Sequence, residues 1–269
     1  MTSPGSERDL IADLALANTL ADNADAITLV RFQANDLVIE TKPDSTPVTD
    51  ADKKVEETIR EVVAAARPHD LVVGEEFGRP DNLDGKYYWV IDPIDGTKNF
   101  LRGIPVWATL IALVNPEHEV VVGVVSAPAL HRRWSAALGY GAHVTIRNQN
   151  PKEISVSKVS TLADAQLSYS DLIGWGERKN NLLTLQENVW RTRGLGDFWS
   201  HMLVAEGAVD IAAEPSLALW DMAALDIIVR EAGGRFSNIE GTSGPHGGSG
   251  VSTNGLLHTS FIDALNGKF

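Results

Sequence analysis

Hydrophobic residues recur at helical spacing in two segments near the start of the chain. The first set, all leucine and isoleucine, predicts a helix from about Glu7 toward Phe32. Ser6 and Asp9, at its start, resemble a capping box. The segment 50–69, "DADKKVEETIREVVAAARPH", repeats an apolar face at the same spacing. We therefore expect two helices in this part of the chain.

Short apolar runs follow the second helix and are typical of β-strands. One of them, "DLVVGEEFG", predicts a buried strand that leads into an acidic turn. Four further runs with short connections predict an antiparallel sheet: "YYWVID", "WATLIALVN", "VVVGVVSAP" and "RRWSAAL". Residues 36–49, with their two prolines, indicate an extended loop or a hairpin.

The pattern changes past about residue 150. The runs "AQLSYSD" and "DIAAEP" look like strands, whereas "GDFWSHMLVAEG" and "WDMAALDIIVREAGG" look like helices. Gly233-Gly234 at the end of the last run is typical of a helix C-cap. We expect an N-terminal α+β half over residues 1–150 and a C-terminal α/β half over residues 151–269, forming one compact unit.

Composition narrows the function classes. The net charge of -13 argues against non-specific binding to nucleic acid and to anionic membranes, but not against an anionic substrate. The chain has no cysteine, which excludes disulfides, thiol catalysis and thiolate zinc sites. No run of about 18 apolar residues predicts a membrane helix, and no basic region followed by an apolar run predicts a signal peptide. We expect a cytoplasmic protein.

An aromatic and β-branched run ends abruptly in two aspartates, Asp92 and Asp95. Two like charges so close are unfavourable unless a shared proton, a nearby cation or a metal ion neutralises them. A turn that caps the next element would explain one aspartate but not both. The Ile94 carbonyl and the Thr97 hydroxyl are further oxygen donors, and ligation by oxygen alone favours Mg²⁺.

Other polar positions are weaker signals when each is taken alone. Glu75-Glu76, at the end of a predicted strand, is typical of a solvated acidic turn. Asp221, which opens a predicted helix, is typical of an N-cap, and so is Asp52. Lys42 alone would be a surface lysine.

The order of these signals is far more specific than any one of them. A polar turn with an aspartate, then Gly-Glu-Glu, then "WVIDPIDGTKNF" and "LWDMAALDIIVREAGG" resembles the inositol monophosphatase superfamily over nearly the whole chain. The resemblance implies an α/β (α+β) fold, the five-layered αβαβα sandwich of inositol monophosphatases and fructose-1,6-bisphosphatases, with the site between the two halves. It also implies a magnesium-dependent, lithium-sensitive phosphatase that forms homodimers and acts on a small phosphate ester.

The same resemblance implies a set of oxygen ligands for two to three Mg²⁺ ions. The ligands of the first ion would be Glu75, Asp92, the Ile94 carbonyl and Thr97. Those of the second would be Asp92, Asp95 and Asp221. A weaker third ion and its waters would lie near Glu75, Glu76 and Asp52.

The resemblance also assigns roles in catalysis. The backbone N–H groups of Gly96 and Thr97 would hold the phosphate. A water made more acidic by a bound ion would attack it without a phosphoenzyme. Thr97, paired with Asp52, would accept or relay that water's proton. Glu75 would take part in catalysis as a ligand of the first ion.

The C-terminal half carries the residues that would select the ester. Asp197, His201 and Glu214, with Lys42 from the N-terminal half, are the candidate substrate-binding residues. An acidic pocket suits an ammonium group, although Asp197 could instead cap a helix and His201 could merely pack beside Trp199. "LGDFW" with the later "LVAEGAVDIAAEP" resembles the histidinol-phosphate phosphatase branch found in actinobacteria and plants. L-histidinol phosphate is therefore the expected substrate, with inositol-1-phosphate as the alternative and a non-catalytic metal or phosphate binder as a third hypothesis.

Overall fold

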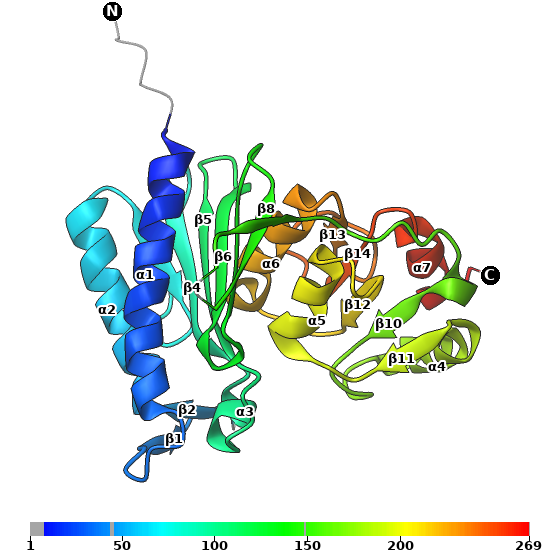
Figure 1. Ribbon diagram of the computed structural model, residues 1–269, viewed down its shortest axis with the longest axis horizontal. Helices are drawn as coiled ribbons and strands as arrows, with labels where there is room; N and C mark the ends of the chain where they lie inside the picture. Colours follow the sequence, from blue (N-terminus) through cyan, green and yellow to red (C-terminus); the bar gives the residue numbers. More distant parts are fainter. Residues whose placement is uncertain (1–7, 44–45, 148, 269) are drawn as a thin grey trace, which may run out of the picture.

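Layers of helices and strands alternate through the molecule (Figure 1). The computed structural model describes residues 8–43, 46–147 and 149–268. Across the long axis there follow a helix pair, a seven-stranded sheet, a second helix pair, a five-stranded sheet and a third helix pair. This arrangement confirms the predicted five-layered αβαβα sandwich.

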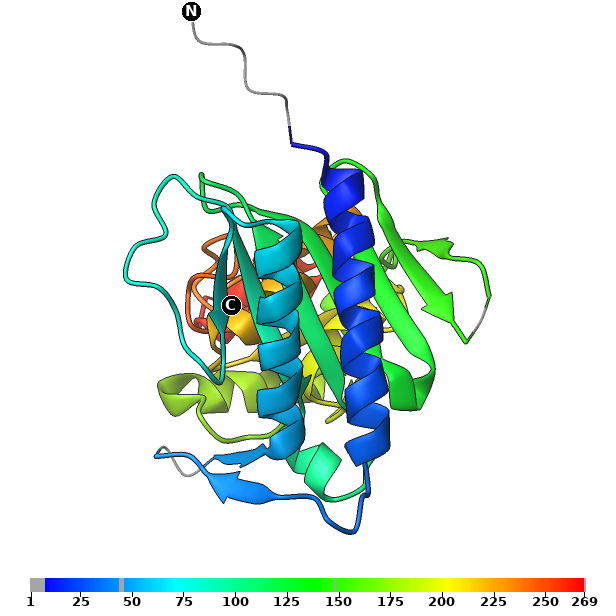
Figure 2. The ribbon, with the colours of Figure 1, turned by 90° about the vertical axis from the view of Figure 1, so that its left-hand side faces the viewer.

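The first helix layer consists of α1 (Leu10–Arg31) and α2 (Asp50–Ala66), which lie side by side over the seven-stranded sheet (Figure 2). Their apolar residues pack on the outer face of that sheet, as their helical spacing predicted. The predicted capping box was wrong about Asp9. That residue is itself the N-cap, and its Oδ1 accepts hydrogen bonds from two following backbone N–H groups at 3.0 Å. Ser6 lies outside the described residues.

The seven-stranded sheet runs in the order β3-β4-β5-β6-β7-β8-β9. Its strands are β3 (Leu71–Gly74), β4 (Tyr88–Asp95), β5 (Ala108–Val114), β6 (Val120–Ala127), β7 (Arg132–Ala137), β8 (Ala142–Ile146) and β9 (Lys152–Ile154). The four central strands are antiparallel, as predicted, but β3 pairs with β4 in parallel. Strands β8 and β9 were not predicted, and β9 lies just past the predicted boundary at residue 150. That boundary stays a prediction.

The middle helix layer consists of α5 (Asp197–Ala205) and α6 (Leu219–Glu231). Its apolar side chains pack on the inner face of the seven-stranded sheet, so the largest core cluster joins the two halves of the chain. On its other side, α5 packs against the five-stranded sheet. As predicted, Gly233 follows α6 with a φ of 85°, a backbone conformation in which glycine is favoured.

The five-stranded sheet runs in the order β11-β10-β12-β14-β13 and is mixed. Its strands are β10 (Gln166–Ser168), β11 (Arg191–Arg193), β12 (Ile211–Glu214), β13 (Arg235–Ser237) and β14 (Gly250–Thr253). Helices α4 (Lys179–Asn188) and α7 (His258–Leu265) cover its outer face. Of these, β10 and β12 were predicted, whereas β11, β13 and β14 were not, since a strand of three or four residues leaves only a weak pattern in the sequence.

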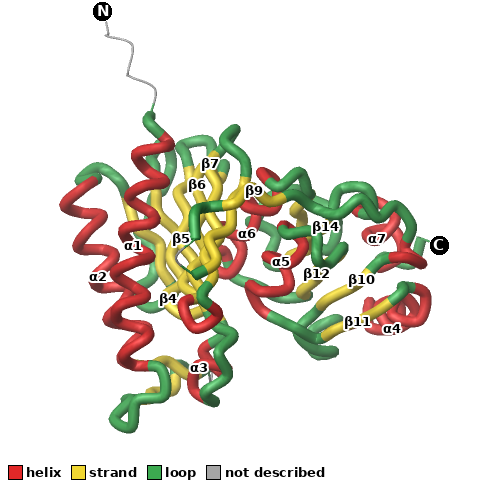
Figure 3. Tube along the Cα trace, viewed as in Figure 1, coloured by secondary structure: helices red, strands yellow, loops and turns green. Residues whose placement is uncertain are grey.

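Smaller elements complete the chain (Figure 3). A hairpin of β1 (Ile39–Thr41) and β2 (Pro47–Thr49) and the short helix α3 (Thr97–Leu101) lie together at one end of the first sheet. Three 3-10 turns are Pro128–Leu130, Leu162–Asp164 and Gly176–Arg178. No helix within the described ranges is both long and apolar enough to cross a bilayer.

The contact between α6 and β6 is close enough to require glycine at position 123. A methyl group on Gly123 would lie 2.4 Å from Cγ2 of Ile227 and 3.0 Å from the carbonyl oxygen of Ala224. We expect Gly123→Ala to lower the free energy of unfolding by about 1–3 kcal/mol, because the helix must move off the sheet. Urea denaturation would measure the loss.

Gly194→Ala is the matched control for this substitution. A methyl group there would have its nearest neighbours at 3.5 Å, an ordinary van der Waals distance. We expect that variant to stay within about 0.5 kcal/mol of the wild type. Equal stabilities for the two variants would contradict the close packing of α6 on β6.

Candidate metal centre and substrate cleft

Three aspartates meet where β4 ends and α6 begins. One carboxylate oxygen from each of Asp92, Asp95 and Asp221 lies within 4.8 Å of the others. Residues three apart in a regular strand face opposite sides of a sheet. The pairing of β4 with β5 shifts its register between Asp92 and Asp95, and this irregularity lets both side chains approach Asp221.

A backbone N–H group orients each of these carboxylates. Asp92 Oδ1 accepts from the N–H of Ile94 at 3.0 Å, and Asp95 Oδ2 accepts from the N–H of Phe198 at 2.7 Å. Asp221 Oδ2 accepts from the N–H of Ala218 at 2.7 Å. Asp221 is therefore not the N-cap that its sequence position suggested, because Ala218 occupies that place and Asp221 is the third residue of α6.

The centre carries an excess of negative charge. Burial, and then the neighbouring carboxylates, raise the pKa of Asp92 and of Asp95 well above the ordinary range for aspartate. Burial likewise raises the pKa of Asp221 to about 6, with the charge of Glu75 adding to it. A hard divalent cation would remove this repulsion, and a set of oxygen donors is what such a cation binds.

Glu75 and Glu76 follow β3 and face the β1–β2 hairpin. Lys42 Nζ lies 2.6 Å from Oε1 of Glu75 and 2.7 Å from Oε1 of Glu76. Burial raises the pKa of Glu76 to about 7 despite this ion pair. Lys42 therefore lies with the two glutamates in a hollow beside the main cleft, apart from the other predicted substrate-binding residues.

The predicted pairing of Thr97 with Asp52 is wrong in this structure. Asp52 is buried and its Oδ2 accepts from the hydroxyl of Thr49 at 2.5 Å and from that residue's N–H at 2.8 Å, closing a capping box for α2. The Thr97 hydroxyl instead donates to the Ile94 carbonyl at 2.9 Å. Asp52 binds the Thr49 hydroxyl because Thr49, the N-cap of α2, lies only three residues before Asp52.

A cleft of about 480 Å³ opens beside the aspartates, between the two halves of the chain. Glu75, Asp95, Gly96, Thr97 and Asp221 line one part of it. The other part is lined by residues of the C-terminal half, which include all three of its predicted substrate-binding side chains. The fold thus brings together residues that are far apart in the sequence.

Two carboxylates stand on the C-terminal wall of the cleft. Asp197 Oδ2 accepts from Nδ2 of Asn99 at 3.2 Å, and Glu214 Oε1 accepts from the hydroxyl of Ser170 at 2.7 Å. Burial raises the pKa of Asp197, and it raises the pKa of Glu214 to about 8. Asp197 is the first residue of α5 with a φ of 48°, so it is not the N-cap that was its alternative role.

His201 is fully buried at the bottom of the cleft. Its Nδ1 lies 2.7 Å from the hydroxyl of Ser252, and its Nε2 has no hydrogen-bond partner in the described part of the chain. Burial lowers its pKa to about 4, so the imidazole is neutral near pH 7. Its ring packs against Phe236 at 5.9 Å between centroids, not beside Trp199.

The sequence did not reveal several polar residues of the cleft. They are Lys98, Asn99, Ser170, Asp171 and Ser216. They lie in turns or short elements, and serine and asparagine are common in such places for structural reasons. No spacing in the sequence distinguishes them from ordinary turn residues.

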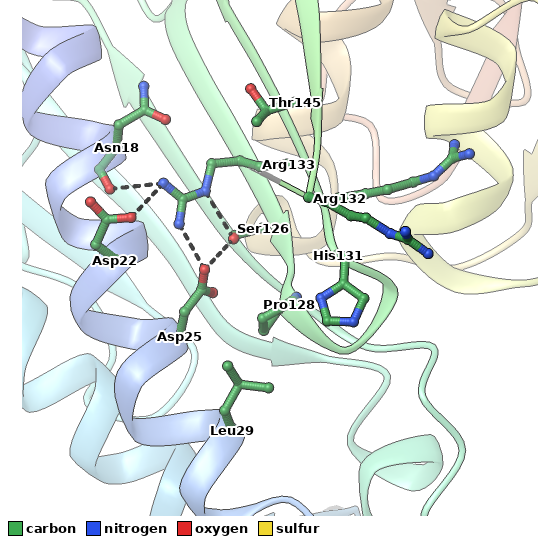
Figure 4. A pocket seen from close by; sticks show the side chains of 11 residues that line it. Asn18, Asp22, Asp25, Leu29, Ser126, Pro128, His131, Arg132, Arg133 and Thr145 are labelled. Atoms are coloured by element: carbon green, nitrogen blue, oxygen red, sulfur yellow. Dashed lines mark hydrogen bonds and ion pairs between the residues drawn. The ribbon is translucent and has the colours of Figure 1, made fainter. Parts of the chain in front are cut away.

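A second hollow, of about 340 Å³, lies between α1 and strands β6 to β8, away from the acidic centre (Figure 4). Arg133 reaches across it and lies 2.7 Å from Asp22 and 2.7 Å from Asp25. Arg132 points the other way, toward Glu206, at 2.7 Å. These ion pairs connect α1 and the end of α5 to the sheet. Among the described residues that line the hollow, only Asp22 and Asp25 carry carboxylates, so it offers no group of three like that of the acidic centre.

Comparison with known proteins identifies the fold family. A model of the inositol monophosphatase family matches residues 10–267. The chain belongs to the inositol monophosphatase family. This membership confirms the resemblance seen in the sequence and agrees with the observed five-layered fold.

Relatives within the inositol monophosphatase family are close. The chain is 56% identical to the histidinol-phosphatase of Mycobacterium tuberculosis, over 94% of this chain and 98% of that protein. It is 53% identical to the histidinol-phosphatase of Streptomyces coelicolor, over 97% and 99%. Among solved structures, the extragenic suppressor protein SuhB from Bartonella henselae superposes with a TM-score of 0.85 at 27% identity, covering 96% of this chain and all of that one.

The raised pKa values predict how stability changes with pH. A carboxyl group with a higher pKa in the folded protein than in the unfolded chain holds its proton more tightly when folded, so stability falls as pH rises toward that pKa. For protein freed of metal with EDTA, we expect the melting temperature to fall between pH 6.5 and pH 8.5. Added Mg²⁺ should raise it more at pH 8.5 than at pH 6.5.

This pH window avoids the opposite effect of the buried histidines, whose lowered pKa costs stability only below about pH 6.5. Asp92→Asn is the comparison variant, since it removes one charge from the centre. The melting temperature of this variant should fall less between pH 6.5 and pH 8.5 than that of the wild type, and it should rise less on addition of Mg²⁺. If the melting temperature of the EDTA-treated wild type did not change between pH 6.5 and pH 8.5, that result would contradict an excess of negative charge at the acidic centre.

Proposed function

We propose that this protein is a magnesium-dependent phosphatase that hydrolyses L-histidinol phosphate to L-histidinol and inorganic phosphate in histidine biosynthesis. The observation that carries the proposal is the identity of 53–56% with two histidinol-phosphatases over nearly the whole of each chain. The predicted family, phosphatase class and substrate all agree with these relatives. The non-catalytic alternative loses its support, because every predicted ligand position keeps an oxygen donor in the structure.

The chemistry of the cleft supports this ester. L-histidinol phosphate carries an ammonium group and an imidazole in addition to its phosphate. Asp197 and Glu214 offer acceptors for the ammonium group. His201 is neutral, and its Nε2 has no hydrogen-bond partner in the described ranges. This nitrogen can therefore form a hydrogen bond with the imidazole of the substrate. Inositol-1-phosphate, the alternative, carries hydroxyl groups and no positive charge.

The acidic centre fits magnesium ions. Its donors are oxygen atoms, and Asp52 Oδ1 is buried without a hydrogen-bond partner in the described part of the chain. The ligands we propose for the first ion are Glu75, Asp92, the Ile94 carbonyl and Thr97. Those for the second are Asp92, Asp95 and Asp221. Glu75 and Glu76 would hold a third ion where Lys42 now lies, with Asp52 nearby.

When bound, these ions supply positive charge that offsets the charge of the phosphate and makes a water more acidic. The residues of the chain orient the reactants. Gly96 and Thr97 border the cleft beside the aspartates, where their backbone N–H groups can hold phosphate oxygens. Thr97 borders the cleft, and Asp52 Oδ1 has no hydrogen-bond partner in the described ranges. Although these two residues do not pair in this structure, we propose both for the route of a proton that leaves the attacking water. The predicted homodimer and the predicted inhibition by lithium stay predictions.

The substrate is tested by comparing kcat/KM for L-histidinol phosphate and for D,L-inositol-1-phosphate with Mg²⁺. We expect a preference of more than about a hundredfold for histidinol phosphate, because only that ester has an ammonium group that can form ion pairs with the acidic wall. This preference corresponds to about 2.7 kcal/mol of transition-state binding. Comparable values would instead make the protein a general or inositol-type phosphatase.

Asp197→Ser tests the acidic wall directly. It removes one charged acceptor, so kcat/KM for histidinol phosphate should fall by about ten- to a hundredfold, while the value for inositol-1-phosphate changes little. Asp164→Ser, an exposed carboxylate of the same half that is not part of the cleft lining, is the control and should leave both values unchanged. Equal losses for both esters with Asp197→Ser would remove Asp197 as a specificity residue.

A further inference from the structure

Ser170 connects the two carboxylates on the C-terminal wall of the cleft. It lies just past β10, at the cleft mouth, and is exposed. Its hydroxyl donates to Oε1 of Glu214 at 2.7 Å and accepts from the backbone N–H of Asp197 at 3.2 Å. One side chain therefore touches both acidic residues, which come from β12 and from the start of α5.

The direction of these two hydrogen bonds follows from their donors. A serine hydroxyl has one proton to donate, and the N–H of Asp197 can only donate. The hydroxyl proton must therefore be the one that reaches Glu214. When Glu214 is charged, its Oε1 accepts that proton, and the hydrogen bond favours this charged form of a carboxyl group that burial would otherwise keep protonated.

The backbone before α5 depends on the same contact. Gly196 and Asp197 have φ values of 73° and 48°, and the second is an uncommon conformation for a residue with a side chain. Gly196 packs against Ser170 so closely that an added methyl group would lie 3.1 Å from the serine hydroxyl oxygen. The hydroxyl thus helps to fix the turn from which the Asp197 side chain enters the cleft.

The wall between these residues has room for part of a ligand. His201 lies in the same cleft, is fully buried, and its Nε2 has no hydrogen-bond partner in the described ranges. A buried polar atom without a partner costs free energy unless a ligand or water satisfies it. The two carboxylates that line the same cleft favour a positive charge on the ligand, and a primary ammonium group has three protons to donate.

We propose that Ser170 is a positioning residue that determines specificity, holding Glu214 and Asp197 as joint acceptors for the primary ammonium group of the phosphate ester. The inference rests on the proposed function for the presence of that ammonium group. It adds a residue that touches neither the phosphate nor the metal centre, and it predicts that selectivity for the amine can be lost without loss of phosphatase chemistry.

The test uses two esters that differ only in the amine: L-histidinol phosphate and its deamino analogue, 3-(imidazol-4-yl)propyl phosphate. The quantity measured is the ratio of their kcat/KM values with Mg²⁺. We expect Ser170→Ala to lower this ratio about tenfold or more through a higher KM for the amine ester, because Glu214 loses the hydroxyl donor and keeps only the backbone N–H of residue 170, and because the Asp197 turn loosens. The kcat for both esters should stay within about threefold.

Two variants accompany Ser170→Ala. Ser160→Ala is the matched control, since Ser160 is an exposed serine of the same half, lies outside the cleft lining, and its hydroxyl makes no hydrogen bond within the described part of the chain. It should keep the wild-type ratio. Ser170→Thr retains the hydroxyl and should recover most of the ratio. A melting temperature for each variant shows whether it is folded.

The pH dependence gives a readout that a merely structural role would not change. Burial raises the pKa of Glu214 to about 8, and the Ser170 hydroxyl acts against that rise. Without the hydroxyl the carboxyl group should hold its proton to higher pH. The fall of KM with rising pH should therefore move to more alkaline pH in Ser170→Ala, for the amine ester only.

The outcomes separate this inference from the proposed function. If the wild type prefers the amine ester and Ser170→Ala keeps that preference, the role of Ser170 is overturned and the proposed function stands. Equal losses for both esters would also overturn it, since that pattern means a general structural effect. A wild-type ratio near one would overturn the ammonium contact, and the comparison with inositol-1-phosphate would then decide the substrate separately.

Discussion

The repulsion among carboxylates at the junction of the layers is the constraint on which this structure depends. Asp92, Asp95 and Asp221 are held close together where little water reaches them, so each raises the cost of charging the others. A protein gains nothing in stability from such a group. The arrangement fits a centre that binds cations and the chemistry that bound cations would support.

The layered fold is what allows these charges to be brought together. Asp92 and Asp95 come from the strand β4, Asp221 from the helix α6, and the N–H that orients Asp95 from the start of α5. The largest core cluster fixes these elements relative to one another, and the close contact of α6 with β6 at Gly123 adds to it. The position of the charges therefore depends on apolar packing that lies outside the cleft.

The cleft divides its tasks between the two halves of the chain. The N-terminal half supplies most of the acidic centre together with Gly96 and Thr97, the residues proposed to bind phosphate, whereas the C-terminal half supplies Asp197, His201 and Glu214. Substrate selection can therefore change through the second set without disturbing the first. This separation is consistent with a family whose members are named for different phosphate esters.

The sequence by itself determined the long helices, the central strands and the acidic motifs, because helical and strand periods and turn chemistry are local properties. It also gave the family, since "WVIDPIDGTKNF" keeps donors at fixed local spacing. It did not predict strands β11, β13 and β14 of the second sheet, the parallel pairing of β3, or the hydroxyl that Asp52 binds. Only the tertiary structure decided that Lys42 lies on Glu75 and Glu76 and that Ser170 joins Glu214 to Asp197, because these contacts link residues far apart in the chain.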